Sequence, residues 1–218
     1  MESNETEEQQ IEALKKWWKE NGSSIITGLL LGLALLFGGK SWFAWQDRNA
    51  ENASNIYATM MAALGNGEEK LVNEKAGRLI ADYTSTPYAP LAALALAKTK
   101  LAQGELVAAR TQLQWALEHT DSDVIRDTVR LRLARVMVAE NDLDGAAALI
   151  SQDRPESAFS PLYGELRGDI QLARGDMGNA RAEYERALAG MSGESPGRQL
   201  LQLKYDNTTP AAGSGDSQ

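Results

Sequence analysis

The residues that could do chemistry are few in this chain, and they do not gather into a reaction centre. The sequence has a single histidine, His119, and no cysteine. A metal site needs several ligands at close spacing, and a nucleophilic triad needs a base that a third group orients. His119 has neither, and its position before Thr120 and Asp121 predicts the solvated end of a helix. We therefore predict no catalytic, cofactor-binding or metal-binding residues.

One short segment resembles the end of a phosphate-binding loop. Gly39-Lys40-Ser41 has the last residues of that motif, but Ala34 stands where the motif requires its first glycine. The carboxylates elsewhere are scattered at helical spacing among Lys and Arg, as solvated surface pairs are. These patterns predict that the protein is not an enzyme, so its function should lie in surfaces that bind a partner.

The clearest structural signal in the sequence is a run of nineteen uncharged residues, Asn21 to Gly39, near the start of a chain that is otherwise charged. As a helix it would span roughly 28 Å, close to the hydrocarbon thickness of a bilayer. Aromatic residues flank it on both sides, as in an interfacial belt: Trp17, Trp18, Trp42, Phe43 and Trp45. We expect an uncleaved transmembrane anchor over residues 21–45 rather than a signal peptide, because the preceding segment is acidic and the cleavage site is poor.

The charges around this run bear on orientation. Residues 1–20 form an acidic tail with a net charge of −3. Three lysines precede the apolar run, while Lys40 and Arg48 follow it, so the positive-inside rule mildly favours a cytoplasmic N-terminus. For the tail itself, a merely solvated segment is favoured over a binding site for a soluble regulatory partner.

Beyond the anchor, residues 46–205 have the size of one domain. Their charges are mixed and slightly acidic, which argues against a nucleic-acid partner, since such a partner needs a clustered basic face. Without cysteines, the domain must be stable through packing alone. Residues 206–218 consist mainly of Thr, Pro, Ala, Gly and Ser and predict a disordered tail.

An internal repeat runs through the domain. Gly104, Asn141 and Gly175 open equivalent breaks that are separated by 37 and 34 residues. At fixed distances from each break, small residues and one larger apolar residue recur: Ala97, Ala134 and Gly168; Ala109, Ala146 and Ala180; Leu113, Ile150 and Tyr184; Ala116, Asp153 and Ala187. A period near 34 with small residues where paired helices meet is the tetratricopeptide pattern. We predict an all-α fold, with a single N-terminal transmembrane helix followed by a tetratricopeptide-like superhelix of helical hairpins.

The repeat is degenerate, and an irregular, alanine-rich helical domain is the alternative. Arg130 stands where an aromatic residue usually opens the first helix, and Asp153 stands at a packing alanine. The helix before Asp153 should therefore end near Ile150. Upstream, a helix over residues 47–64, a turn at 65–67 and a helix to about Tyr83 are expected to form a fourth, divergent hairpin, whose first helix can continue from the anchor.

Two surfaces could bind proteins. Gly28 and Gly32 lie one turn apart in the anchor and would let another transmembrane helix approach closely. In the register of the repeat, an inner groove would receive side chains from the first helix of each hairpin: Leu94, Lys98, Leu101, Leu131, Arg135, Val138, Leu162 and Leu172, with Glu165 and Asp169. Such a groove suits an extended peptide or a partner helix. The alternative is that several of these leucines pack against neighbouring helices.

Several motifs resemble one bacterial family. The YfgM family, ancillary subunits of the Sec translocon, is similar to this chain in five segments: Glu8 to Gly22 before the anchor, Val129 to Val136, Glu165 to Asp169, Arg174 to Asp176 and Asn179 to Arg181. The likeness extends from about Glu8 to Asn207, and the residues after Asn207 lie outside it.

The resemblance implies an inner-membrane protein with a cytoplasmic N-terminus and a periplasmic domain. It implies association with the SecYEG channel and with a membrane-anchored periplasmic chaperone of the prolyl-isomerase type. The domain would then help newly exported polypeptides to leave the translocon and fold. A structural scaffold that links inner-membrane proteins without contacting clients is the alternative function. The family supplies no catalytic motif.

Overall fold

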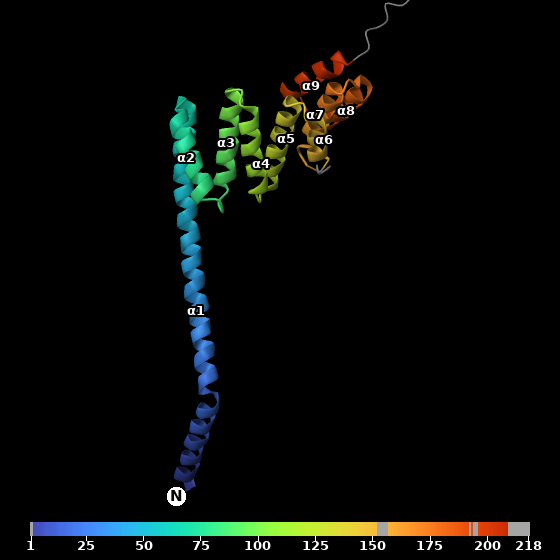
Figure 1. The fold of residues 1–218 in the computed structure, drawn as a ribbon. Coiled ribbons are helices and arrows are strands. Elements are labelled where there is room, and N and C mark those ends of the chain that lie inside the picture. The colour runs from blue at the N-terminus through green and yellow to red at the C-terminus, as the bar shows by residue number, and fades with distance from the viewer. Residues whose placement is uncertain (1, 152–156, 192, 194–195, 209–218) are drawn as a thin grey trace, which may run out of the picture. The chain divides into compact units, whose positions relative to one another are not determined.

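The computed structural model describes residues 2–151, 157–191, 193 and 196–208, and every regular element within them is an α-helix (Figure 1). The helices are α1 (Glu2–Asn66), α2 (Glu69–Asp82), α3 (Tyr88–Ala102), α4 (Leu106–Glu118), α5 (Asp123–Ala139), α6 (Leu143–Ile150), α7 (Ser160–Ala173), α8 (Met177–Gly190) and α9 (Pro196–Asn207). The chain forms two compact units, residues 1–52 and 53–218, and α1 contributes to both. The all-α prediction is confirmed.

The first unit is the greater part of α1. Residues 9–66 of this helix contain a stretch that is long and apolar enough to cross a membrane. A helix of that composition in a soluble core would bury its leucines, but here Leu35 and Leu36 are 76% and 71% exposed. The helix continues without a break into residues 53–66 of the second unit, as the sequence allowed.

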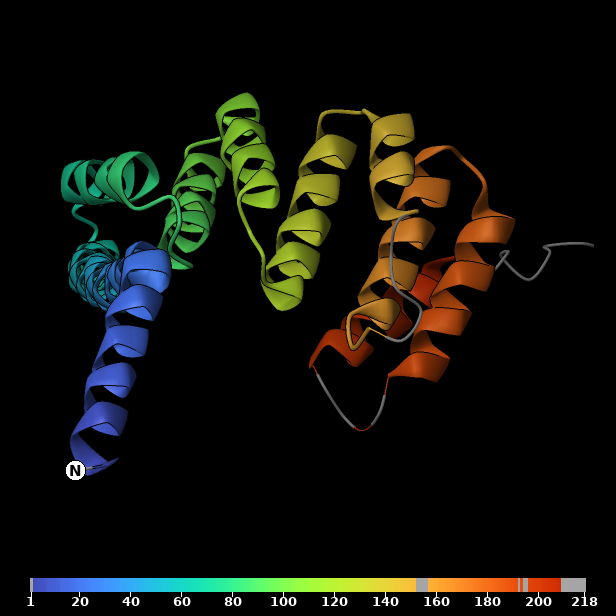
Figure 2. The same ribbon diagram turned by 90° about the horizontal axis from the view of Figure 1, so that it is seen from below.

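The second unit is an array of antiparallel helical hairpins. Consecutive helices pack against each other from α2 to α6 and from α7 to α9, and α7 also contacts α5 and α6 (Figure 2). The end of α1 and α2 form the fourth hairpin that was expected upstream of the three repeats, because Met60, Val72 and Leu79 share one buried apolar cluster with Ala92 and Leu96 of α3. The described residues thus form the stacked hairpins that the repeat predicts.

One type of turn joins the two helices of every hairpin. Four residues with positive φ occupy equivalent places: Gly67 (74°), Gly104 (76°), Asn141 (63°) and Gly175 (82°). At the second turn, the Gly104 amide donates to the Leu101 carbonyl (3.0 Å) and the Glu105 amide donates to the Lys100 carbonyl (2.9 Å). This is the Schellman arrangement, which needs a left-handed residue that glycine or asparagine can supply.

The small and large residues of the repeat meet as their spacing predicts. Ala109, Ala146 and Ala180 are fully buried, and so is Tyr184, the largest of the bulky apolar residues. A Cβ atom on Gly168 would overlap the ring of Tyr184, so α7 and α8 approach each other as closely as a glycine permits. Helix α6 ends at Ile150, as expected, while Asp153 lies outside the described residues.

The last helix extends further than the sequence suggested. Helix α9 includes residues 206 and 207 and thus ends two residues beyond the domain boundary predicted at residue 205. Leu201 is fully buried against Tyr184 and Leu188, and the Gln202 side chain donates to Asp206 (3.0 Å). These contacts keep the end of α9 helical. Residues 209–218 of the predicted disordered tail lie outside the described residues.

Candidate interaction groove

An open hollow of about 570 Å³ lies between the first helices of the last two hairpins and α9. We call it the α5–α7–α9 groove after the helices that supply its lining. Its residues are Arg135, Val138 and Ala139 from α5, Leu162, Glu165, Leu166 and Asp169 from α7, and Gly197, Leu200 and Lys204 from α9. Three segments that are distant in the sequence thus build one surface.

The floor of the groove is apolar. Leu166 is buried at its base, and Val138 and Leu162 are partly buried beside it. Leu200 projects from α9 and remains 54% exposed. A surface of this kind gains free energy when an apolar side chain of a partner displaces water from it.

One wall of the groove is held by an ionic cluster. The ammonium group of Lys204 lies 2.6 Å from Glu165 Oε1 and 2.8 and 2.7 Å from the two carboxylate oxygens of Asp169. Tyr184 also donates its hydroxyl to Asp169 Oδ1 at 2.8 Å. Burial by itself lowers the pKa of Lys204, but the hydrogen bonds to Asp169 and Glu165 outweigh it and keep the pKa above its ordinary value of 10.5. The lysine therefore stays charged and ties α9 to α7.

The other wall carries a cation that is more open to solvent. The Arg135 side chain is 47% exposed, and its nearest guanidinium nitrogen lies 3.8 Å from Glu165 Oε2. The pair is weak, because 3.8 Å is longer than a hydrogen bond and the guanidinium group is half open to water. Arg135 can therefore turn toward a carboxylate or a backbone carbonyl of a bound peptide without breaking a strong bond.

The structure brings five of the ten predicted inner-face residues together and separates the others. Arg135, Val138 and Leu162 line the groove, together with Glu165 and Asp169. Leu94 and Leu131 are only 7% and 3% exposed and belong to the core, so the alternative reading holds for these two leucines.

The remaining three predicted residues lie elsewhere. Lys98 is exposed and lines a separate hollow of about 250 Å³ with Leu64 and Glu69. Leu101 and Leu172 are 38% and 40% exposed and line neither hollow.

The sequence did not point to the contribution of α9. Gly197, Leu200 and Lys204 form one wall of the groove, yet Lys204 is 35 residues from Asp169 and 39 from Glu165. The only local signal is the helical spacing of Leu200 and Lys204, which places both on one face of α9.

The two anchor glycines are open in the structure. A Cβ atom built on Gly28 or on Gly32 would meet nothing within 4 Å. This chain therefore leaves room for a second helix at both positions, and the packing face stays a prediction.

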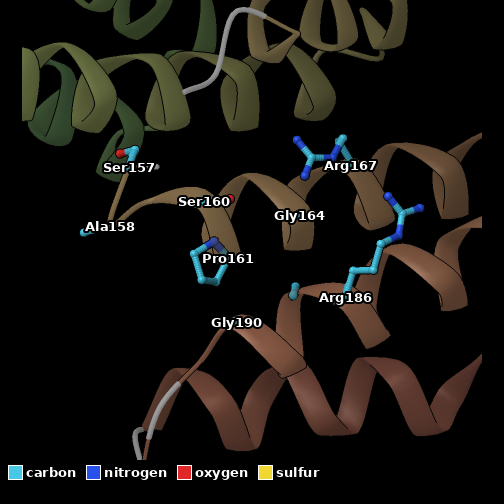
Figure 3. A pocket seen from close by; sticks show the side chains of 9 residues that line it. Ser157, Ala158, Ser160, Pro161, Gly164, Arg167, Arg186 and Gly190 are labelled. Atoms are coloured by element: carbon cyan, nitrogen blue, oxygen red, sulfur yellow. The ribbon is translucent and has the colours of Figure 1, made fainter. Parts of the chain in front are cut away.

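A second hollow, of about 440 Å³, lies between α7 and α8 (Figure 3). Figure 3 shows Arg167 and Arg186 at one end of it, with Pro161 and Gly190 toward the other. Both guanidinium groups are already paired with one carboxylate, because Glu183 lies 3.1 Å from Arg167 Nε and 2.8 Å from Arg186 Nη2. Each guanidinium group therefore already has a carboxylate partner within the chain, and we assign this hollow no ligand.

The single histidine ends a helix, as expected. His119 is the last cap residue of α4, where its Nδ1 donates to the Trp115 carbonyl (2.8 Å) and its ring stacks on the indole at 4.1 Å. Among the described residues, no three His, Asp or Glu side chains are placed to hold a metal ion.

Comparison with known proteins shows where this architecture recurs. Residues 15–209 match the model of a tetratricopeptide repeat-like domain. The chain is 34% identical to the ancillary SecYEG translocon subunit of Haemophilus influenzae, over 92% of this chain and 97% of that protein. The chain belongs to the family of ancillary SecYEG translocon subunits. The proteins of the same name from Escherichia coli and Aggregatibacter actinomycetemcomitans are 31% and 30% identical, over 95% and 92% of this chain and 98% and 97% of their own lengths. No solved structure matches the chain.

Membership in the SecYEG ancillary subunit family confirms the resemblance read from the sequence and points to a non-catalytic role. The tetratricopeptide-like match extends through α9. The helix that supplies Leu200 and Lys204 is therefore part of the family domain, and the α5–α7–α9 groove lies within the matched region.

Proposed function

We propose that this protein is a membrane-anchored, non-enzymatic interaction module at the exit of the SecYEG channel. Its α5–α7–α9 groove would bind newly exported polypeptides and assist their release and folding. The names of the relatives support the association with SecYEG, and the exposed apolar stretch of α1 supports membrane anchoring. The observation that carries the proposal is an open groove with an apolar floor on a tetratricopeptide-like array.

The proposed topology places the N-terminus in the cytoplasm and residues 46–205 in the periplasm, at the inner membrane. The excess of lysines before the apolar run supports this orientation. A membrane-anchored periplasmic chaperone of the prolyl-isomerase type is the proposed partner in folding. Gly28 and Gly32 are the proposed contact with another transmembrane helix, because a Cβ atom built on either one meets no atom of the described residues within 4 Å.

The proposed mechanism is capture by proximity. Unfolded polypeptides expose apolar side chains, which Val138, Leu162 and Leu200 can cover, while Arg135 can donate hydrogen bonds to a carboxylate or a carbonyl group. Binding in so open a groove is weak, and weak binding allows the client to leave. The anchor compensates for this weakness, because it raises the effective concentration of the groove near emerging chains.

The experiment compares two leucines of one helix. Leu200 lines the groove and is 54% exposed, whereas Leu203 is 61% exposed and lies outside it. Full-length protein in lipid nanodiscs, as wild type, Leu200→Glu or Leu203→Glu, is added to an unfolded secretory protein as denaturant is diluted. Aggregation is followed by light scattering. We expect wild type and Leu203→Glu to slow aggregation and Leu200→Glu to lose most of the effect.

Two outcomes would contradict the proposal. If wild type leaves aggregation unchanged, the protein does not bind clients, and the scaffold function accounts for the family better. If Leu203→Glu fails as badly as Leu200→Glu, the activity belongs to exposed apolar surface in general rather than to the groove.

A further inference from the structure

Residues 11–18 of α1 present an apolar face that no described part of the chain covers. Ile11, Leu14 and Trp18 recur at helical spacing, and Trp17 adjoins them. Their side chains are 52%, 65%, 53% and 50% exposed, respectively. These four large apolar side chains form a stripe along about two turns of one face of the helix, with Gln10 on the same face.

The opposite face of the same turns is charged. Glu12, Lys16, Lys19 and Glu20 lie on it, and Lys15 lies at its border with the apolar stripe. These residues contain three lysines against two glutamates, although the first twenty residues together are acidic. An amphipathic helix with lysines on its polar face and tryptophans on the other is the type that lies in a membrane interface.

The segment between this stripe and the apolar run suits a change of direction. Gly22-Ser23-Ser24 follows directly, and helices kink most readily at such Gly and Ser pairs. The Asn21 side chain donates to the Trp17 carbonyl (3.0 Å), and the Trp18 indole covers Gly22, where a Cβ atom would come within 3.2 Å of it. In Figure 1, the dark-blue start of α1 is set at an angle to the stretch that follows.

We propose that residues 9–20 lie in the headgroup layer of the membrane, on the side from which the chain begins. The apolar stripe would rest on the acyl chains, and the lysines would face the phosphates of anionic lipids. Continuity with the apolar run supports a lipid surface as the occupant, because Trp17 and Trp18 stand directly before Asn21. Standing upright instead, this helix would carry Ile11 roughly 15 Å into water, at about 1.5 Å per residue.

This placement differs from the solvated tail that charge and polarity favour. The acidic residues that dominate the tail's charge are concentrated in residues 2–8, whereas residues 12–20 contain the three lysines. Lysines beside an anionic leaflet are attracted to it, so the basic part of the tail gains from lying on the surface.

The absence of cysteine in the sequence makes a direct test possible. Single-cysteine variants of the full chain, Leu14→Cys, Trp18→Cys, Lys16→Cys and Glu20→Cys, are labelled with a nitroxide. They are reconstituted at low protein density in vesicles of phosphatidylcholine and phosphatidylglycerol that contain no other protein. Collision of the nitroxide with oxygen, which partitions into lipid, is compared with collision with a water-soluble nickel chelate.

We expect the oxygen-to-nickel ratio to be several-fold higher at positions 14 and 18 than at positions 16 and 20. Leu33→Cys in the apolar run and Val107→Cys in the domain serve as lipid and water references, because both side chains are exposed. Equal nickel access at all four positions would show a solvated tail and overturn the proposal. Equal exclusion of nickel at all four would also overturn it, because the segment would then extend the span. Neither result bears on client binding in the α5–α7–α9 groove.

Discussion

At the scale of single residues, the closest approach of two helices depends on a glycine. Gly168 faces Tyr184, which is fully buried and has no room to retreat. We expect Gly168→Ala to destabilise the domain by about 1–3 kcal/mol, the usual cost of overpacking a core. Urea unfolding of the full-length chain in detergent, followed by circular dichroism, measures this change.

Gly77 provides the matched control for that substitution. It lies inside α2, it is exposed, and a Cβ atom on it would meet nothing within 4 Å. Gly77→Ala should therefore stabilise the protein by about 0.5–1 kcal/mol, because alanine favours the helix. Shifts of the same sign for both variants would show that steric contact with Tyr184 does not set the spacing of α7 and α8.

Lys204 is the residue that holds α9 against the groove. Lys204→Met keeps the length of the side chain but leaves Asp169 without its cation and Glu165 with only the more distant Arg135. Since Glu165 is nearly buried, we expect a loss of roughly 1–3 kcal/mol in the free energy of unfolding. Lys75→Met removes the partner of Glu74, a carboxylate that is 64% exposed, and should change stability by less than about 0.5 kcal/mol. A thermal unfolding series that ranks the two variants equally would contradict the role assigned to Lys204.

At the scale of elements, α5 and α7 are joined by buried polar groups where the repeat usually has an aromatic contact. Asp127 is 2% exposed and receives hydrogen bonds from the Tyr163 hydroxyl (3.2 Å) and the Ser157 hydroxyl (2.8 Å). Arg130 also donates to Asp127, at 3.4 Å. The arginine at the aromatic position thus belongs to a polar network, which links successive hairpins by hydrogen bonds as well as by packing.

Because of this network, the free energy of unfolding should change with pH in the alkaline range. Burial is the main cause that raises the pKa of Tyr163 from 10.0 to about 12. In the unfolded chain the tyrosine loses its proton near pH 10, whereas the folded chain retains it up to about pH 12. The free energy of unfolding should therefore be steady below pH 10 and fall as the pH rises from 10 to 12.

The phenylalanine variant tests the source of this decline. Tyr163→Phe should lower stability at pH 8, because Asp127 loses a donor, and should also flatten the decline above pH 10. Part of the decline will remain, because burial and the bond to Asp169 raise the pKa of Tyr184 as well. The same slope in wild type and variant would exclude Tyr163 as a contributor.

The sequence predicted the elements better than the surface they build. Gly104, Asn141 and Gly175 located the turns because left-handed backbone has a strong residue preference. The burial of the repeated alanines was predicted from the same alignment of the repeats. Leu94 and Leu131 were predicted to line the groove because helical periodicity shows which residues share one face of a helix. It does not show whether another helix covers that face. The α9 wall was missed because its pairing with α7 depends on contacts between residues far apart in the sequence.

At the scale of the whole molecule, the anchor should contribute to partner binding through its glycines. We expect the double variant Gly28→Leu and Gly32→Leu to reduce co-purification with SecYEG from membranes several-fold, because bulky side chains keep helices apart. Gly38→Leu is the control, since a Cβ atom there is equally unhindered but lies outside the glycine pair. Undiminished co-purification of the double variant would locate the contact elsewhere on the protein.

The central claim is that the α5–α7–α9 groove receives polypeptides as they emerge from the channel. The most direct test is photocrosslinking in intact cells, with a photoreactive residue at Leu162 or Leu200 in the groove and at Leu203 or Val107 outside it. We predict adducts with nascent secretory chains from the two groove positions and few from the other two. Adducts with a single folded membrane protein, and none with nascent chains, would contradict the claim and favour a scaffold.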